Sequence, residues 1–198
     1  SFSIILNMPG QYNVENAVPS CILADVLGID DNVVADACCH FPGVGRRMSH
    51  CGTASISGGE VLLLEDYGHH PRAIKATLTA LRHAWPKRRL VVVFQPHRYS
   101  RTKQLLQEFA QLSAYADYFV ILGVYAASET ELAGGTAHDL FQLIATMGRA
   151  EQTILVDNII RLPVILKSII CPDDIILLQG AGNIGAQAPK ILHALEQG

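Results

Sequence analysis

The stretch "LVVVFQPHRYSRT" (90–102) decides the fold of this chain. It opens with five consecutive apolar residues, three of them valine, which is typical of a strand buried on both faces of a parallel sheet. The strand runs into His97, Arg98 and Arg101, whose side chains are cationic or can be protonated. Ligands of open α/β sheets collect at the carboxyl ends of strands, so we interpret this loop as a site for an anion.

Four further segments have the same character as this strand. They are the short apolar runs "EVLLLEDY" (60–67), "YFVILGV" (118–124), "QTILVD" (152–157) and "DIILLQG" (174–180). Stretches with helical spacing of apolar residues separate them, and in such a pattern each helix crosses over to the next parallel strand. The sequence therefore predicts an α/β, Rossmann-like domain with a doubly wound, mostly parallel sheet.

The segments between the strands carry helix signals. Thr136 is a candidate N-cap and Gly148 a candidate stop for the helix between them. Pro163 lies inside an apolar pattern and predicts a kink or a short helix, and Pro189 marks an irregular first turn. The predicted helical stretches are 71–85, 102–115, 136–148, 158–169 and 183–197.

Residues 1–45 have a different organisation. "SFSIILNMPG" (1–10) resembles a strand cut off from a preceding chain, whereas 11–29 and 31–41 predict two helices with no sheet of their own. "PGVGRR" (42–47) is typical of a hinge-like connector. We therefore expect 1–45 to be the end of a preceding domain and 46–198 to be the Rossmann-like domain.

Composition excludes several classes of protein. With 198 residues, 49% hydrophobic and 17% charged, the chain has the profile of a soluble globular domain, with or without a fragment of another. A net charge of −3 argues against general nucleic-acid binding, which needs a basic face. No apolar run approaches the roughly 18 residues of a membrane span, and no signal peptide is visible. Five irregularly spaced cysteines suggest reduced thiols in a cytoplasmic protein.

Positive charge is concentrated in three segments, 46–47, 87–89 and 97–101. "KRR" at 87–89 follows Pro86 and is interpreted as a solvated turn. Arg46 and Arg47 lie at the domain junction, where either a hinge salt bridge or a phosphate contact accounts for them. Arg98 and Arg101 lie where a strand gives way to a helix, and two guanidinium groups beside a helix N-terminus favour bound anions.

"GAGNIG" matches the glycine spacing of a dinucleotide-binding loop at Gly180, Gly182 and Gly185. The match lies on the last strand, and the acidic residue expected about 20 positions further on is absent from the chain. We therefore predict a tight glycine turn whose backbone N–H groups line an anion site, and not an NAD site.

The loop "EDYGHHP" (65–71) admits three interpretations. The first is a metal site, but adjacent His69 and His70 cannot easily direct both rings at one metal ion, and no spaced set of ligands completes a coordination shell. Asp66 can instead accept from a pair of sugar hydroxyls while the histidines donate to an anion. The third interpretation is a capping aspartate and two surface histidines.

Asn13 and Asn16, spaced i, i+3 on one helix face, either read an adenine edge or cap a helix.

Taken in order, these motifs resemble the Mur ligases, ATP-dependent amide-forming enzymes of peptidoglycan precursor synthesis. The resemblance rests on "PGQYNVENA", "FPGVGRRM", "EDYGHHPRAIKATL", "VVFQPHRYSRT", "VYAASE" and "QGAGNIG", which cover nearly the whole chain. "DYGHHP" together with "QPHRYSRT" is similar to the alanine-adding branch of the family. The chain lacks the P-loop sequence and the UDP-sugar domain of this family, so the resemblance implies the tail of the central domain plus the third domain.

The resemblance also implies chemistry and roles for particular residues. The intact enzyme would use ATP and Mg²⁺ to join L-alanine to UDP-N-acetylmuramate through an acyl phosphate, with the Mg²⁺ ligands in the absent central domain. The resemblance assigns no catalytic residue within the chain. The implied ATP-binding residues are Asn13 and Asn16 for adenine, Arg47 for phosphates, Asp66 for ribose and Tyr67 near the base. The implied substrate-binding residues are His69, His70, Arg98 and Arg101.

These implications lead to two hypotheses about function. The first is a fragment of a cytoplasmic bacterial ligase that is inactive alone and works with its own missing N-terminal and central domains, without nucleic acid or membrane partners. The second is a stand-alone, non-catalytic α/β domain that binds an anionic metabolite or a partner protein.

Overall fold

The computed structural model describes residues 3–8 and 10–197, and its centre is a mixed sheet with the strand order β1-β2-β6-β3-β4-β5. β1 pairs antiparallel with β2, and the other neighbouring pairs are parallel. The five strands predicted for the sheet are confirmed, and β1 was not predicted. The strands are β1 Ser49–Ile56, β2 Gly59–Asp66, β3 Leu90–Phe94, β4 Tyr118–Leu122, β5 Thr153–Val156 and β6 Ile175–Gln179.

The strand β3 is buried along its whole length, as its apolar sequence predicts. Leu90, Val92 and Phe94 pack into the core on one face of the sheet, and Val91 and Val93 pack into the core on the other. This alternation follows from the two-residue period of a strand. β3 therefore needs a helical layer on each side, and the chain supplies both.

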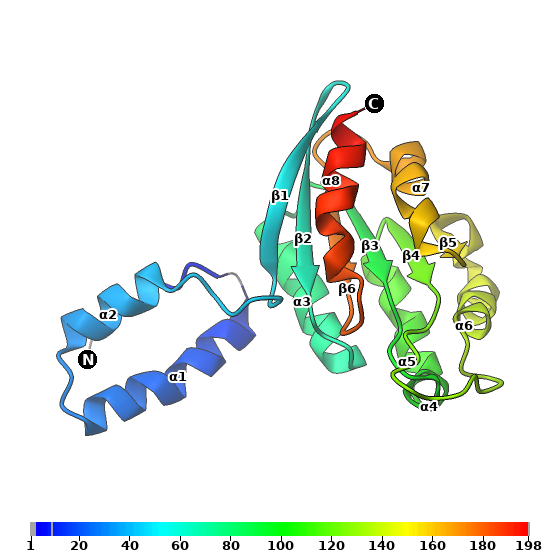
Figure 1. Cartoon of the computed structure of the whole chain (residues 1–198). Helices are drawn as coiled ribbons and strands as arrows, with labels where there is room; N and C mark the ends of the chain where they lie inside the picture. Colours follow the sequence, from blue (N-terminus) through cyan, green and yellow to red (C-terminus); the bar gives the residue numbers. More distant parts are fainter. Residues whose placement is uncertain (1–2, 9, 198) are drawn as a thin grey trace.

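Helices α3, α5 and α6 contribute to the core on one face, and α7 and α8 contribute to the core on the other (Figure 1). The doubly wound α/β fold is thus confirmed. α8 also packs closely against β1, where a Cβ atom on Gly52 would lie 2.7 Å from a methyl group of Leu192. The α-helices of this domain are α3 Pro71–Ala84, α4 Tyr99–Gln104, α5 Leu106–Leu112, α6 Ala137–Ile144, α7 Leu162–Ile169 and α8 Ala188–Glu196.

Most helix boundaries follow the sequence signals. Thr136 caps α6 through a reciprocal capping box with Asp139, and Gly148 has a φ of 78° where the helical segment ends. Pro189 lies in the first turn of α8, as predicted, and of the two outcomes predicted for Pro163 the structure shows a short helix, α7, with this proline in its first turn. The predicted helix 102–115 is wrong as a single element, because the chain breaks at Leu105 into α4 and α5.

Short turns complete the connections between these elements. η1 Ser113–Tyr115 continues α5, and η2 Ala145–Arg149 and η3 Ala150–Gln152 lead from α6 to β5. η4 Ile159–Arg161 and η5 Gly185–Gln187 precede α7 and α8.

The N-terminal part forms the two predicted helices, α1 Gln11–Val26 and α2 Asp31–His40. They project away from the sheet domain as a pair (Figure 1). The strand predicted at 1–10 is wrong for residues 3–8, which form no strand. A strand is stabilised by pairing with another, and in the described part of the chain residues 3–8 pair with none; the remainder of that prediction lies partly outside the described residues.

The turn predicted at "KRR" is present, but two of its three side chains are half-buried and bonded to the chain. Arg88 donates to the carbonyls of Asp173 and Asp174, and Arg89 donates to the Ile169 carbonyl and lies 3.5 Å from the Asp174 carboxylate. These contacts join the amino ends of β3 and β6. The described helices include none that is both long and apolar enough to cross a membrane.

Candidate functional site

The carboxyl ends of β2, β6 and β3 lie side by side, and the chain leaves them toward opposite faces of the sheet. β2 continues into α3, and β3 continues through α4 into α5, on one face, whereas β6 continues into α8 on the other (Figure 1). Such a switch in direction opens a crevice at the strand ends. The loops predicted to carry chemistry, after residues 66, 94 and 179, therefore meet beyond the carboxyl ends of the central strands.

Asp66 lies at the centre of these strand ends and is only 5% exposed. Its carboxylate accepts hydrogen bonds from the backbone N–H groups of Met48 (3.0 Å) and Gly68 (2.8 Å) and from Nε2 of Gln179 (2.8 Å). A buried carboxylate is stable only when its oxygens are satisfied in this way. Asp66 thus ties the connector before β1, the β2 loop and β6 together, and its predicted contact with a ribose stays a prediction.

The two adjacent histidines have different positions. His70 is exposed and caps α3, because its Nδ1 accepts from the N–H of Arg72 at 3.3 Å. His69 faces the loop after β3, with its ring centroid 5.9 Å from that of His97. Tyr67 packs edge-on against His69 at 5.5 Å and is 37% exposed. The structure therefore brings His69 to the candidate anion site and gives His70 a capping role.

The loop after β3 is held by the loop after β4. The Arg98 N–H donates to the Tyr125 carbonyl at 2.9 Å, and the Tyr125 N–H donates to the Pro96 carbonyl at 2.8 Å. The rings of His97 and Tyr125 stack with centroids 5.4 Å apart. The sequence assigned Tyr125 no role, and it named His97 only as part of the predicted anion loop, without an individual role. Only its contacts with distant residues single it out.

Arg101 determines the state of the His97 ring. One of its guanidinium nitrogens lies 3.2 Å from Nδ1 of His97 and also reaches the His97 carbonyl at 3.4 Å. A guanidinium group only donates, so Nδ1 must be the accepting nitrogen of His97 and the proton resides on Nε2. His97 is therefore a neutral donor with one defined tautomer.

Burial and positive charge act together on both histidines. Burial lowers the pKa of His69, and the charge of Arg101 lowers it further. The same two causes, in the same order, lower the pKa of His97. Both imidazoles are thus uncharged at neutral pH, and the positive charge of this cluster resides on Arg98 and Arg101.

The glycine loop after β6 is fixed by side chains from other loops. Arg46 donates to the carbonyls of Gly180 (3.2 Å) and Gly182 (3.1 Å), and its guanidinium group lies 4.8 Å from the centre of the Tyr67 ring. Gln95 donates to Asn183 at 2.9 Å. Arg46 Nε also lies 4.0 Å from the Glu65 carboxylate, so of the two explanations for Arg46 the salt bridge is the one the structure shows. The glycine loop bends through 181–184, and its predicted anion site stays a prediction.

The residues predicted to bind ATP lie around the start of α1 and the connector. The charges of Asp66 and Arg47 both act on the Tyr12 hydroxyl, although burial is the main cause of its raised pKa. Asn13, next to Tyr12, is half-buried, whereas Asn16 and Arg47 are exposed. The start of α1 therefore lies within electrostatic range of Asp66 and Arg47, and the predicted nucleotide contacts of these residues stay predictions.

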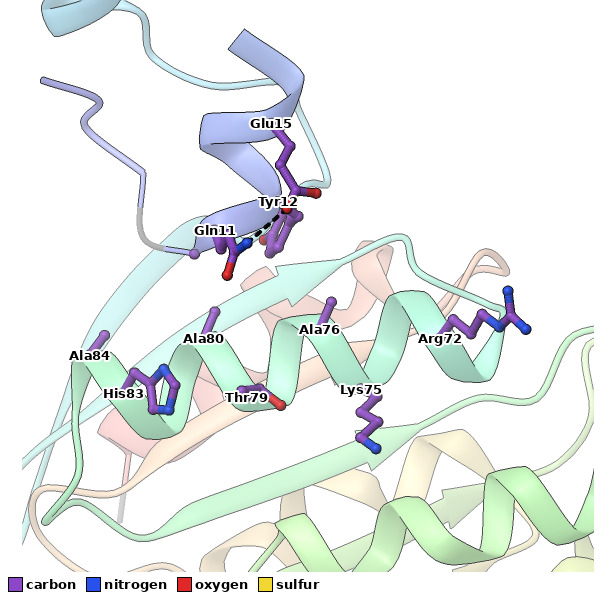
Figure 2. Close-up of a pocket in the computed structure, with 11 residues that line it drawn as sticks. Gln11, Tyr12, Glu15, Arg72, Lys75, Ala76, Thr79, Ala80, His83 and Ala84 are labelled. Atoms are coloured by element: carbon purple, nitrogen blue, oxygen red, sulfur yellow. Dashed lines mark hydrogen bonds between the residues drawn. The ribbon is translucent and has the colours of Figure 1, made fainter. Parts of the chain in front are cut away.

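A groove of about 790 Å³ separates the first turns of α1 from α3 (Figure 2). The side chains of Ala76, Ala80 and Ala84 form its floor, and Gln11 donates to Glu15 on the opposite wall at 3.0 Å. A Cβ atom on Gly10 would lie 3.0 Å from Cβ of Ala80, so the backbone before α1 touches α3 directly. Among the described residues, no three metal-ligating side chains come together.

Residues 46–182 match the family model described as "Mur ligase, glutamate ligase domain". This match covers more than half of the chain. The chain belongs to the Mur ligase family. The resemblance inferred from the ordered motifs is thereby confirmed.

Individual relatives agree with this assignment. The chain is 45% identical to a UDP-N-acetylmuramate–L-alanine ligase of Coxiella burnetii, over 93% of this chain and 39% of that protein. The crystal structure of a UDP-N-acetylmuramate–alanine ligase from Thermotoga maritima matches with a TM-score of 0.79 and 26% identity, over 100% of this chain and 40% of that one. A murein peptide ligase from Psychrobacter arcticus has a TM-score of 0.69 at 20% identity, over 98% of this chain and 38% of that one, which shows a shared fold. The chain thus spans about two-fifths of the length of these relatives.

Proposed function

We propose that this chain is the amino-acid-binding part of a longer ATP-dependent ligase that joins L-alanine to UDP-N-acetylmuramate in peptidoglycan precursor synthesis. The observation that supports it most is the convergence of His69, His97 and Arg101 beyond the carboxyl ends of β2, β6 and β3. Two neutral imidazoles and a guanidinium group form a site for a small carboxylate or phosphate.

The nucleotide part of the proposal uses the residues around the connector. Asn13 and Asn16 would bind adenine, Arg47 the phosphates, Asp66 the ribose, and Tyr67 would pack near the base. The proximity of Tyr12 to both Asp66 and Arg47 supports a shared site. Asp66 already accepts three hydrogen bonds from the chain, so it has capacity for about one more, since an ionised carboxylate has about four acceptor positions.

The substrate part of the proposal uses the loops after β2 and β3. His69, His70, Arg98 and Arg101 would hold the alanine carboxylate and the acyl-phosphate anion. ATP phosphorylates the muramoyl carboxylate, the alanine amine attacks the acyl carbon, and the tetrahedral intermediate expels phosphate. Cationic groups that face the transferring phosphoryl group and the oxyanion lower the barrier by electrostatic stabilisation. The described residues offer no cluster for Mg²⁺, so we assign its ligands to the central domain of the longer protein.

The proposed domain division places 1–45 at the end of the central domain and 46–198 in the third domain. Exposed apolar side chains on the helical pair support it, among them Val26 (75%), Ile22 (60%) and Val33 (59%). Isolated domains seldom expose so many apolar side chains on one pair of helices. We further propose a cytoplasmic location, in keeping with the free cysteines and the nucleotide substrates.

The test is ATP-dependent phosphate release with UDP-N-acetylmuramate and L-alanine, measured on this chain and on the protein that includes its upstream domains. We expect only the longer protein to release phosphate, and we expect the release to depend on both substrates. Release by neither would favour the second hypothesis, a non-catalytic domain that binds an anionic metabolite or a partner protein. The anion cluster favours the metabolite, and equilibrium dialysis of the chain with phosphate would show it.

A further inference from the structure

Glu129, in the loop after β4, is hydrogen-bonded to the first turn of α4. Its carboxylate accepts from both donors of Ser100, from the N–H at 3.0 Å and from the Oγ–H at 2.6 Å. Ser100 is the second residue of α4, and Arg98, at the N-cap position, makes no capping bond with its own side chain. Glu129 thus supplies from another loop the cap that the helix lacks locally.

The backbone around this contact adopts conformations that are rare for residues other than glycine. Ala127 and Ser128 have φ values of 48° and 72°, and Arg98, on the facing loop, has a φ of 70°. Side chains with a Cβ atom are strained in this region, and such strain persists only where surrounding contacts determine the conformation. The contacts between the two loops include those of Glu129 with Ser100 and of Tyr125 with Arg98 and His97.

Glu129 also faces the cations of the candidate site. Its carboxylate lies 3.9 Å from a guanidinium nitrogen of Arg98. Hydrogen bonds from Ser100 are the main reason that the pKa of Glu129 lies below its usual range, so the group is ionised throughout the neutral range. Arg101, one residue beyond Ser100, contacts His97 instead. The carboxylate therefore fixes the position of Arg98 and the register of α4, and leaves Arg101 directed at the histidine cluster.

We propose that Glu129 is a positioning residue for the amino-acid site, acting through Ser100 and Arg98 to hold the guanidinium groups of the loop after β3 in their binding geometry. This inference rests on the proposed function, since it assigns the held cations to the alanine carboxylate. It also explains why the loop after β4 keeps the strained backbone of Ala127 and Ser128, which places Glu129 against Ser100.

Kinetics of the longer ligase test the proposal. Glu129→Ala should raise the KM for L-alanine about 10- to 100-fold, because misplacing a binding group by about 1 Å has effects of this size. The KM for ATP should stay within about twofold, since the ATP-binding residues lie elsewhere. Glu129→Gln keeps an acceptor oxygen without the charge and should have a smaller effect. Glu131→Ala, an exposed carboxylate of the same loop, is the matched control and should behave as wild type.

A second measurement uses the 198-residue chain itself. The amide proton of Ser100 and the Nε–H protons of Arg98 and Arg101 should shift in NMR spectra of Glu129→Gln and not of Glu131→Ala. An unchanged alanine KM in folded Glu129→Ala or Glu129→Gln overturns the proposal. If Glu129→Ala does not fold, Glu129→Gln and Ser100→Ala decide it by the same criterion. If the wild-type ligase shows no alanine dependence, the proposed function fails, and unshifted arginine signals then overturn the positioning role separately.

Discussion

Replacing Arg101 by Met removes one positive charge and keeps most of the apolar stem of the side chain. Arg101 is half-buried, donates to His97 at 3.2 Å, and its charge lowers the pKa of both His69 and His97. Hydrogen bonds to a charged group contribute about 1.5–3 kcal/mol. In the longer ligase proposed above, losing that contribution to a bound carboxylate corresponds to a rise of about 10- to 150-fold in the KM for alanine, at about 1.36 kcal/mol per factor of ten.

The same variant has a second readout that needs no catalysis. Titration of the imidazole Cε1–H signals by NMR should give higher pKa values for His69 and His97 in Arg101→Met than in the wild-type chain. Lys103→Met, which removes an exposed charge from the same helix, is the control and should leave both values unchanged. Unaltered histidine titrations together with an unaltered alanine KM would refute the assignment of Arg101 to the anion site.

Three further outcomes follow from the same contacts. His69 and His97 have lowered pKa values in the folded chain, so the unfolded chain binds more protons than the folded chain as the pH falls below the ordinary imidazole pKa of about 6.5. The melting temperature should therefore fall on acidification through that value, and it should fall less when both histidines are replaced by Gln. Asp66→Asn places an N–H group among donors such as the Met48 N–H and should lower the free energy of unfolding by about 1–3 kcal/mol, measured by urea denaturation. Gly182→Ala brings a Cβ atom into overlap with Oε1 of Gln95 and should cost about 1–3 kcal/mol. Gly45→Ala, with open space around it, should change stability by less than about 0.5 kcal/mol; equal effects of the two glycine substitutions would contradict this packing argument.

The buried strands and their order along the chain were predictable because local sequence determines them. Five apolar runs with helical stretches between them permit few arrangements other than a doubly wound sheet. β1 escaped prediction because its sequence "SHCGTASI" is small and polar, and because it forms an edge that pairs only with β2. The break at Leu105 was equally invisible, since the apolar spacing continues through it.

The candidate site was predictable as a region, whereas its internal contacts were not. The sequence places His69, Arg98 and Arg101 in loops at strand ends, and strand order brings those loops together. The partners of these residues come from loops far away in sequence: Tyr125 stacks on His97, and Glu129 binds Ser100. No local pattern specifies such pairs, because each depends on the register between β3 and β4.

The connector between the helical pair and the sheet domain is held in the candidate site from Arg46 onward. Arg46 and Met48 have left-handed φ values of 61° and 46°, and both are bonded into the site, Arg46 to the glycine loop and Met48 to Asp66. Two strained residues that are held in this way move with the sheet domain and not with the helices. Gly45, in contrast, lies in open space, because a Cβ atom at this position would have no neighbour within 4 Å. Any change in the orientation of α1 and α2 would therefore be absorbed before Arg46, and Arg47 would stay with the sheet domain while Asn13 and Asn16 move relative to it. A nucleotide that contacts both groups would then bind only one orientation of the two parts.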